Sequence, residues 1–494
     1  MVRSLNLRYV ILLFSFAMAA AAPVVFIEPE GAVQRATEGN DPTQIYRPVT
    51  DPSRIATYRR WLNNEAAERG LRLFEQARSV AQSRHLPNIP SAYYVALIPG
   101  GNHAAIGFRL RNGSKIDDYP HTPFIKLEAD PKPFEDTFLH ETGHVILYLL
   151  NGARSFPGRD ICSIPHSTAA LTDRGTALSE GFAIHLETLN AHLSHNPETL
   201  AFYQHRRFRF GNFKTSQSEY FHSVADLLTF AQTFSRYQAV RDNAFAFESA
   251  FTGPDYLRVQ LDPARDFSSL RNPDQLLQSE GFYATFFFSF IERGDDVNSE
   301  EVLRARYSKV FLALADMFAT KTFDEDSPHL LHFVETYSAL YPGEAGQVND
   351  ALLDLSHGVF VDRDAPRIWH DLYATAIRLD SDHLHLDRIE ETRSGWQALV
   401  KDPKSLYSRI GAEIRCEVKG VPVQLVDFGD PTPLVFDVNT VPIGIMRMVP
   451  FITEQEIQRW LSEREIHPFA NSADFQARAS LNASSIGALD LRVQ

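Results

Sequence analysis

The chain has 494 residues, of which 44% are hydrophobic and 12% aromatic. This is enough apolar material for roughly two to four compact domains and argues against extensive disorder. A formal net charge of −14 disfavours binding to a nucleic-acid backbone over most of the surface. Two cysteines, Cys162 and Cys416, are too few for a disulfide scaffold, and the sequence leaves open whether they pair.

The N-terminus has the pattern of an export signal. Two arginines precede an apolar stretch that ends in small residues at Ala22, as in a cleavable secretory signal. We therefore expect residues 1–22 to be a signal peptide, cleaved near Ala21 or Ala22, and the mature protein to be secreted or periplasmic with no membrane span. The alternative is an uncleaved membrane anchor, because apolar residues resume after Pro23 and the combined stretch approaches the roughly 20 residues that span a bilayer.

The spacing of apolar residues changes twice in the segment after the leader. Residues 23–50 contain four prolines and few apolar clusters, which indicates an extended lead-in. Apolar residues then recur at helical spacing over 51–85. Three β-rich runs separated by glycine, proline and asparagine predict a small antiparallel sheet between Ser91 and Asp130. The next segment, 134–150, is predicted to be helical.

That helical segment contains the run HETGH at residues 140–144, an HExxH pattern. A spacing of four residues places His140 and His144 on one face of a helix, where both imidazoles can bind one Zn²⁺. Glu141 lies further round the same face and can act as general base on a zinc-bound water. The glycine between them provides room for close helix packing.

A catalytic zinc site usually has three protein ligands, and Glu180 is the best candidate for the third. It lies in the run TDRGTALSEGFAIHLETL, which predicts a helix with Thr172 or Asp173 as its N-cap. Glu280, in a second SEGF run within the most apolar helix of the chain, is the alternative.

HExxH followed by a helix with the run SEGFA resembles the gluzincin family of zinc metallopeptidases. The resemblance covers roughly residues 51–195. His140, His144 and Glu180 match the zinc ligands of that family, and Glu141 matches its general base. The resemblance implies a β-sheet before the metal helix and a helical subdomain after the second ligand helix.

Other residues are candidates for supporting the site. Asp136 and Glu187 are both spaced to orient a ligand imidazole, and both are equally compatible with ordinary charges on a helix surface. His166, on the loop between the two site helices, is either a cleft residue or an ordinary loop histidine. The family also implies a tyrosine or histidine that stabilises the oxyanion, for which the candidates are Tyr220, His222 and Tyr283.

The C-terminal run FDVNTVPIGIMRMVPFITEQEIQRWLSEREIHPFANSADFQAR resembles a helix-hairpin-helix module of the competence-type DNA-receptor kind. In that family a glycine-rich hairpin lets backbone amides approach a DNA phosphate. Here residues 449–452 read Val-Pro-Phe-Ile, which removes one amide and blocks close approach. We therefore expect a degenerate module with a structural or protein-contact role.

The sequence thus predicts a mostly helical α+β protein, in which a small antiparallel sheet is followed by metal-binding helices, a large helical subdomain and a small C-terminal module. The leading hypothesis is an exported zinc-dependent peptidase that acts on peptides or proteins. The alternatives are a non-catalytic, protein-binding scaffold of gluzincin-like fold and, less favoured, a DNA-handling protein. The expected divisions are a signal peptide (1–22), the lead-in (23–50), a sheet and zinc-site domain (51–195), a helical subdomain (196–360), a helical and short-strand connector (361–433) and the helix-hairpin-helix-like module (434–494).

Overall fold

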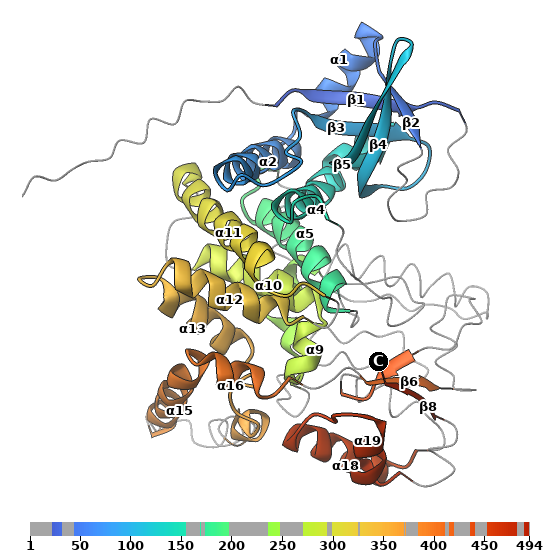
Figure 1. Cartoon of the computed structure of the whole chain (residues 1–494). Coiled ribbons are helices and arrows are strands. Elements are labelled where there is room, and N and C mark those ends of the chain that lie inside the picture. Colours follow the sequence, from blue (N-terminus) through green and yellow to red (C-terminus); the bar gives the residue numbers. More distant parts are fainter. Residues whose placement is uncertain are drawn as a thin grey trace, which may run out of the picture.

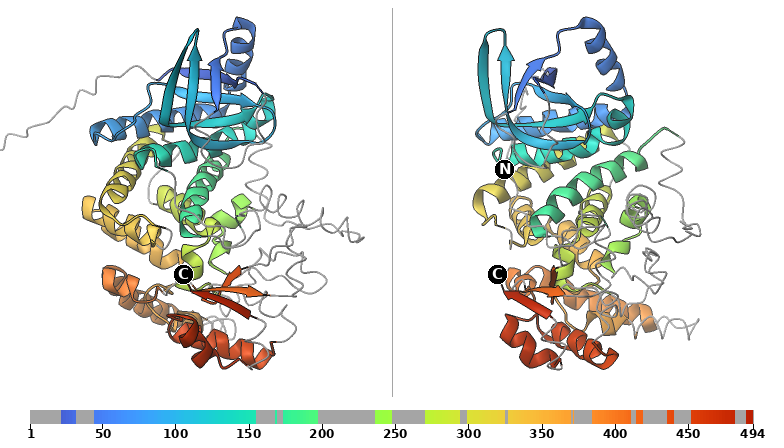
Figure 2. Two further views of the ribbon diagram at one scale, coloured as in Figure 1. Left: turned by 45° about the vertical axis from the view of Figure 1, so that its right-hand side comes forward. Right: turned by 90° about the vertical axis from the view of Figure 1, so that its right-hand side faces the viewer.

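The computed structural model shows a mostly helical α+β protein, which confirms the predicted fold class (Figure 1). A strand barrel and the helix of residues 52–61 stand at one end, the last helices and strands stand at the other, and most of the remaining helices lie between them (Figure 2). In the described part of the chain, no helix is both long and apolar enough to cross a membrane. The structure describes residues 22–31, 44–154, 168, 173–196, 236–247, 270–293, 299–324, 327–369, 371, 384–410, 414–418, 435–439, 452–481 and 489–493.

Five strands close into a barrel in the order β1-β2-β4-β5-β3. The pairs β1/β2 and β4/β5 are antiparallel, whereas β1/β3, β2/β4 and β3/β5 are parallel. The sheet is therefore mixed, and the prediction of an antiparallel sheet is wrong in this respect. The strands are β1 (Val24–Pro29), β2 (Ile45–Pro48), β3 (Tyr93–Ile98), β4 (His103–Asn112) and β5 (Lys115–Glu128).

The parallel pairs join strands that are far apart in the sequence. Between β1 and β3 lie the helices α1 (Pro52–Trp61) and α2 (Glu65–Ser83), and a helical crossover lets two strands run in the same direction. Both β1 and β2 come from the stretch 23–50, where an extended lead-in was expected. Pro29 and Pro48, which favoured a loop there, stand at the last position of each strand.

The barrel packs on its inside and on the face turned to the helices. Inside, the rings of Phe108 and Tyr119 stack with centroids 5.0 Å apart. On the helix side, Tyr93 of β3 meets Phe74 of α2 edge to face at 4.7 Å. Aromatic pairs of this kind stabilise the packing beyond the effect of the apolar area that they bury. The barrel is therefore packed firmly against the neighbouring helices.

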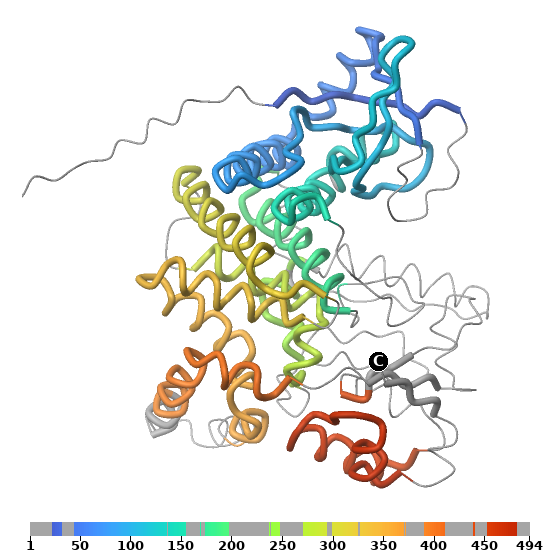
Figure 3. The backbone as a smooth tube through the Cα atoms, in the orientation of Figure 1, coloured from blue at the N-terminus to red at the C-terminus, as the bar shows by residue number. Residues whose placement is uncertain are grey.

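The predicted helix over 134–150 is interrupted at Thr137. It consists of α3 (Pro131–Asp136) and α4 (Phe138–Leu150). The second site helix, α5 (Arg174–His192), begins after Asp173, whose side chain accepts a hydrogen bond from the Thr176 amide at 2.8 Å. Asp173 is thus the N-cap, as one of the two predicted options had it. In Figure 3 these teal and green helices lie between the blue barrel and the yellow to orange helices of residues 273–355.

The remaining helices of the central part share one apolar core with α2, α4 and α5, in which α10 packs on α5 and α11 packs on α2 and α4. The helix that starts at Glu280, predicted to be the most apolar of the chain, is buried on nearly all sides. These elements are α8 (Arg236–Arg241), the 3₁₀ turn η2 (Ala244–Ala246), α9 (Pro273–Leu277), α10 (Glu280–Glu292), α11 (Glu300–Thr320), α12 (His329–Leu340), α13 (Ala345–Leu355), α15 (Leu384–Val400) and α16 (Pro403–Tyr407).

Two helices stand in the C-terminal region, where the helix-hairpin-helix-like module was predicted. The first begins with a capping box between Thr453 and Glu456, and its Trp460 donates a hydrogen bond to the Val438 carbonyl at 2.9 Å. Most of the expected hairpin, 449–451, lies outside the described residues. The elements here are β6 (Ile414–Val418), β7 (Val435–Asp437), α18 (Glu454–Ile466), α19 (Ser472–Ala479) and β8 (Leu489–Val493), with the sheet ordered β7-β6-β8.

The helices α5 and α10 cross at a very short distance. A Cβ atom on Gly181 would lie 2.4 Å from the Cβ of Tyr283 and 2.6 Å from the carbonyl oxygen of Glu280. Both separations are far below van der Waals contact. Only glycine at this position lets the two backbones approach as they do.

We therefore expect Gly181→Ala to lower the free energy of unfolding by about 1–3 kcal/mol, because α5 and α10 must move apart. Gly395→Ala is the matched control, since Gly395 lies on an exposed part of α15 with open space around it. That change should be neutral or stabilise by up to about 1 kcal/mol. Denaturant unfolding of the two variants measures the difference, and equal effects would contradict the close crossing.

Candidate metal centre

The helix α4 turns one face to the barrel and the opposite face to α5. On the barrel side, Thr142 donates a hydrogen bond to the Phe138 carbonyl at 2.7 Å, and its Oγ1 lies 2.6 Å from the Tyr93 hydroxyl of β3. His140 and His144 are each two positions away from Thr142, which is about 200° round a helix. Fixing Thr142 against the barrel therefore turns both imidazoles toward α5.

Gly143 sets the separation of α4 and α5. A Cβ atom at this position would lie 2.9 Å from the Cα of Ala183 and 3.2 Å from its Cβ. The prediction that Gly143 provides room for close packing is confirmed. The approach brings Glu180, one turn before Ala183, opposite the two histidines.

Three side chains converge between these helices. His140 Nε2 lies 3.1 Å from His144 Nε2 and 3.1 Å from Glu180 Oε2, and His144 Nε2 lies 3.5 Å from Glu180 Oε1. Ligand atoms placed tetrahedrally at 2.0–2.1 Å from a zinc ion are about 3.3 Å apart, so these separations fit one metal ion. Among the described residues, His140, His144 and Glu180 are also the group of donors found close enough together to hold a metal.

The outward nitrogen of each imidazole has a polar neighbour. His140 Nδ1 lies 2.8 Å from Glu187 Oε1, an ion-pair distance at which the N–H is not aligned for a good hydrogen bond. Tyr237 of α8 donates a hydrogen bond to the other Glu187 oxygen at 3.3 Å. The Ser179 hydroxyl oxygen lies 2.9 Å from His144 Nδ1. Contacts of this kind fix the orientation and tautomer of metal-binding histidines.

Sequence reasoning found Glu187 and missed Ser179 and Tyr237. Glu187 follows from helix phase, because seven residues after Glu180 is nearly the same direction on α5. Ser179 carried a weak signal as the residue just before the expected ligand. Tyr237 carried none, because it belongs to a helix with no motif, 50 positions from Glu187.

For both His140 and Glu141, burial and nearby charges shift the pKa in opposite directions. Burial alone would lower the pKa of His140, but the carboxylates of Glu180 and Glu187 outweigh it and raise that pKa well above 6.5. The resulting imidazolium stabilises the metal-free fold below the unfolded-state pKa, and this contribution is lost as the pH rises through the raised pKa. Burial raises the pKa of Glu141, against the opposing effects of His140, His144 and a hydrogen bond from the Ala104 amide of β4.

The other candidates lie elsewhere or outside the described residues. Tyr283 is fully buried on α10, and its hydroxyl accepts a hydrogen bond from the Leu330 amide at 3.2 Å, so it serves helix packing. Glu280 is also buried, at the start of α10, and is not among the three converging donors. The side chain of Asp136 and the residues His166, Tyr220 and His222 lie outside what the structure describes.

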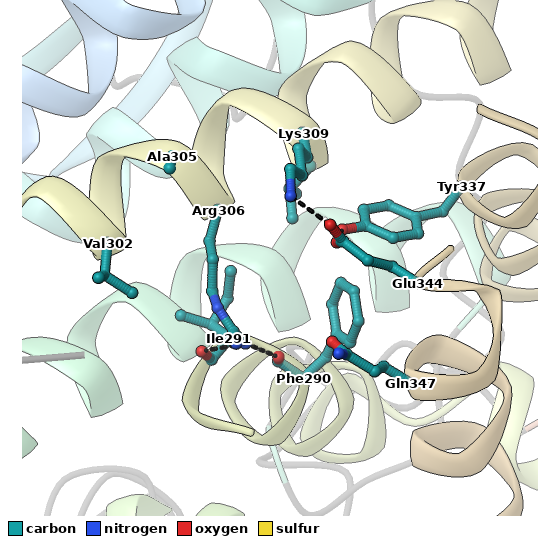
Figure 4. A pocket seen from close by; sticks show the side chains of 10 residues that line it. Phe290, Ile291, Val302, Ala305, Arg306, Lys309, Tyr337, Glu344 and Gln347 are labelled. Carbon is teal, nitrogen blue, oxygen red and sulfur yellow. Dashed lines mark hydrogen bonds and ion pairs between the residues drawn. The ribbon is translucent and has the colours of Figure 1, made fainter. Parts of the chain in front are cut away.

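A separate cavity of about 250 Å³ lies among α10, α11, α12 and α13 (Figure 4). Arg306 donates hydrogen bonds to the carbonyls of Phe290 and Ile291 at 3.0 and 2.9 Å. Across the cavity, Glu344 pairs with Lys309 and accepts a hydrogen bond from Tyr337 at 2.7 Å. These polar groups join the four helices to one another and contribute nothing to the converging site.

Comparison with family models, curated proteins and solved structures gave no match. Any function must therefore be argued from the geometry of the site itself.

The converging donors predict that the purified protein contains one zinc ion per chain by elemental analysis. Glu180→Gln should lose this zinc, since an amide is a much poorer ligand than a carboxylate. Glu280→Gln should retain it, because Glu280 lies outside the group. Zinc that is kept by the first variant and lost by the second would show that Glu280 is the third ligand.

We also expect Glu187→Gln to weaken zinc binding by about 10–100-fold, because the imidazole of His140 loses the carboxylate that orients it. Competition with a chromophoric chelator measures the affinity. Glu301→Gln is the matched control, since Glu301 is exposed on α11. An affinity unchanged in both variants would show that Glu187 does not support the metal site.

Proposed function

We propose that this protein is an exported zinc-dependent hydrolase, and specifically a peptidase of the gluzincin type. The observation that carries the proposal is the convergence of His140, His144 and Glu180 at metal-ligand spacing. Two histidines and one glutamate form the ligand set of known catalytic zinc sites in peptidases, which leave a coordination position open for water or substrate. Glu141, the next residue on α4, is buried beside the same group.

The three ligands and Glu141 have different chemical roles in the proposed reaction. A zinc ion held by the three ligands would supply Lewis acidity, which polarises a carbonyl oxygen and lowers the pKa of nearby water. Glu141 is the residue that accepts the proton. Burial raises the pKa of Glu141, which makes its carboxylate a stronger base than an exposed one. The Ala104 amide fixes the direction of its carboxylate.

The position of β4 supports an extended peptide as the substrate. Since the Ala104 amide is directed at Glu141, it faces away from β5 and marks the edge of β4 that adjoins the site. In the part of the chain that the structure describes, β2 pairs with this edge only at Arg109 and Leu110. The segment 103–107 therefore offers backbone donors and acceptors with which an extended chain can pair.

We expect Glu141→Gln to keep the zinc and lose turnover of a protein substrate such as casein by at least about 10²-fold, the usual contribution of a general base. The change preserves the shape of the side chain, so the unfolding midpoint should stay close to that of the parent. Glu301→Gln should keep full activity. Rates of peptide release and elemental analysis on the same samples measure both properties.

The outcome separates two functions. Turnover that persists in Glu141→Gln, or that survives complete removal of metal by a chelator, would sink the proposed mechanism. Stoichiometric zinc in a parent protein that cleaves no peptide or protein would instead favour the protein-binding scaffold.

A further inference from the structure

Ala22 is the first residue that the structure describes, and it meets a carboxylate. Its backbone nitrogen lies 2.8 Å from Oε1 of Glu75 in α2. The other oxygen of Glu75 is occupied by Arg78, whose Nε and Nη2 lie 3.1 and 2.9 Å from Oε2. Each oxygen of this partly buried carboxylate therefore has its own partner, and the partner of Oε1 is the backbone nitrogen of Ala22.

The residues after Ala22 hold its nitrogen in this place. The Pro23 carbonyl accepts a hydrogen bond from the Tyr93 amide at 3.0 Å. The parallel pairing of β1 and β3 follows immediately, with Val24 opposite Tyr93. Ala22 itself packs against the main apolar core. Among the described residues, the contact with Glu75 thus depends on the barrel and α2.

The alanine run 19–22 gives two positions at which small residues allow removal of a leader. Cleavage after Ala21 turns the Ala22 nitrogen into an α-ammonium group that already faces Glu75. Cleavage after Ala22 would make Pro23 the first residue and leave Oε1 without this donor. An α-amine is largely protonated at neutral pH, since its usual pKa is about 7.7–8.0, and an α-ammonium group adds the attraction of opposite charges to the hydrogen bond with the carboxylate.

We propose that the mature protein begins at Ala22 and that Glu75 binds the new α-ammonium group, which fixes the first strand of the barrel. In the cleavage, water adds across the Ala21–Ala22 peptide bond, and an endopeptidase of the export machinery catalyses the reaction. Ala21 keeps the carboxylate, and the amine of Ala22 takes up a proton. The leader then comprises residues 1–21, the shorter of the two lengths that the sequence pattern predicts. The metal site has no part in this proposal.

The N-terminus of the protein recovered after export from the full-length chain is the first test. N-terminal sequencing should give Ala-Pro-Val, and the intact mass should correspond to residues 22–494. A chain that begins at Pro23, or one that retains residues 1–21, would overturn the proposal. The second of these results is the one expected of an uncleaved membrane anchor.

The ion pair is tested by a cycle of four mature chains. They begin either at Ala22 or with one added glycine before it, and they carry either Glu75 or Glu75→Gln. The added residue moves the ammonium away from Glu75, so it should lower the Tm by roughly 1–3 °C with Glu75 and have no further effect with Glu75→Gln. Glu68→Gln is the control, because Glu68 is exposed on α2. In this variant the added glycine should lower the Tm by the same amount as in the parent chain. Equal effects in the Glu75 and Glu75→Gln chains would overturn the proposal.

The reactivity of the α-amine gives a readout that does not depend on stability. Acylating reagents react only with the deprotonated amine. An ion pair with a carboxylate favours the protonated form and so raises the pKa of the amine. The pH profile of labelling at Ala22 should give a pKa above the ordinary range of about 7.7–8.0 and a return to that range in Glu75→Gln. An ordinary value with Glu75 in place would contradict the pairing.

Discussion

The helix α5 is held between two close crossings, and the candidate site depends on both. Gly143 lets α4 approach α5 on one side, and Gly181 lets α10 approach it on the other. Glu180 lies next to Gly181 in the sequence, and it faces α4, away from the α10 crossing. A small displacement of α5 would change both separations that involve Glu180, because α4 carries the two histidines and α5 carries the glutamate.

The barrel contributes to the same site from the opposite side of α4. Tyr93 of β3 contacts Thr142, and the Ala104 amide of β4 contacts Glu141, so two neighbouring residues of the HExxH run are each tied to a different strand. These contacts set the rotation of α4 about its axis, while Gly143 sets its distance from α5. A barrel of mixed strands thus supports α4 through Thr142 and borders the site through the contact between Ala104 and Glu141.

Local sequence pattern predicted the directions of the site residues within each helix, but it did not predict how the strands pair. The period of an α-helix relates His140 to His144 and Glu180 to Glu187, so their relative directions could be predicted without knowing the fold. The order of strands in the barrel could not, because the pairs β1/β3 and β2/β4 depend on which distant segments meet after the helices have packed. For the same reason Tyr237 carries no signal in the sequence, although it completes the contacts around Glu187.

The charges in the site explain why a metal suits it. Glu141, Glu180 and Glu187 lie near two imidazoles, in a region where water is mostly excluded. Burying carboxylates costs free energy unless positive charge compensates them. Without metal the compensation comes from a proton, since the pKa of His140 is raised well above its usual value. A divalent cation at the point where the Nε2 atoms and the Glu180 carboxylate converge would supply more positive charge and would leave Glu141 free of the metal. Metal binding and folding would then be linked, because the same ion would offset the cost of burying the residues that hold it.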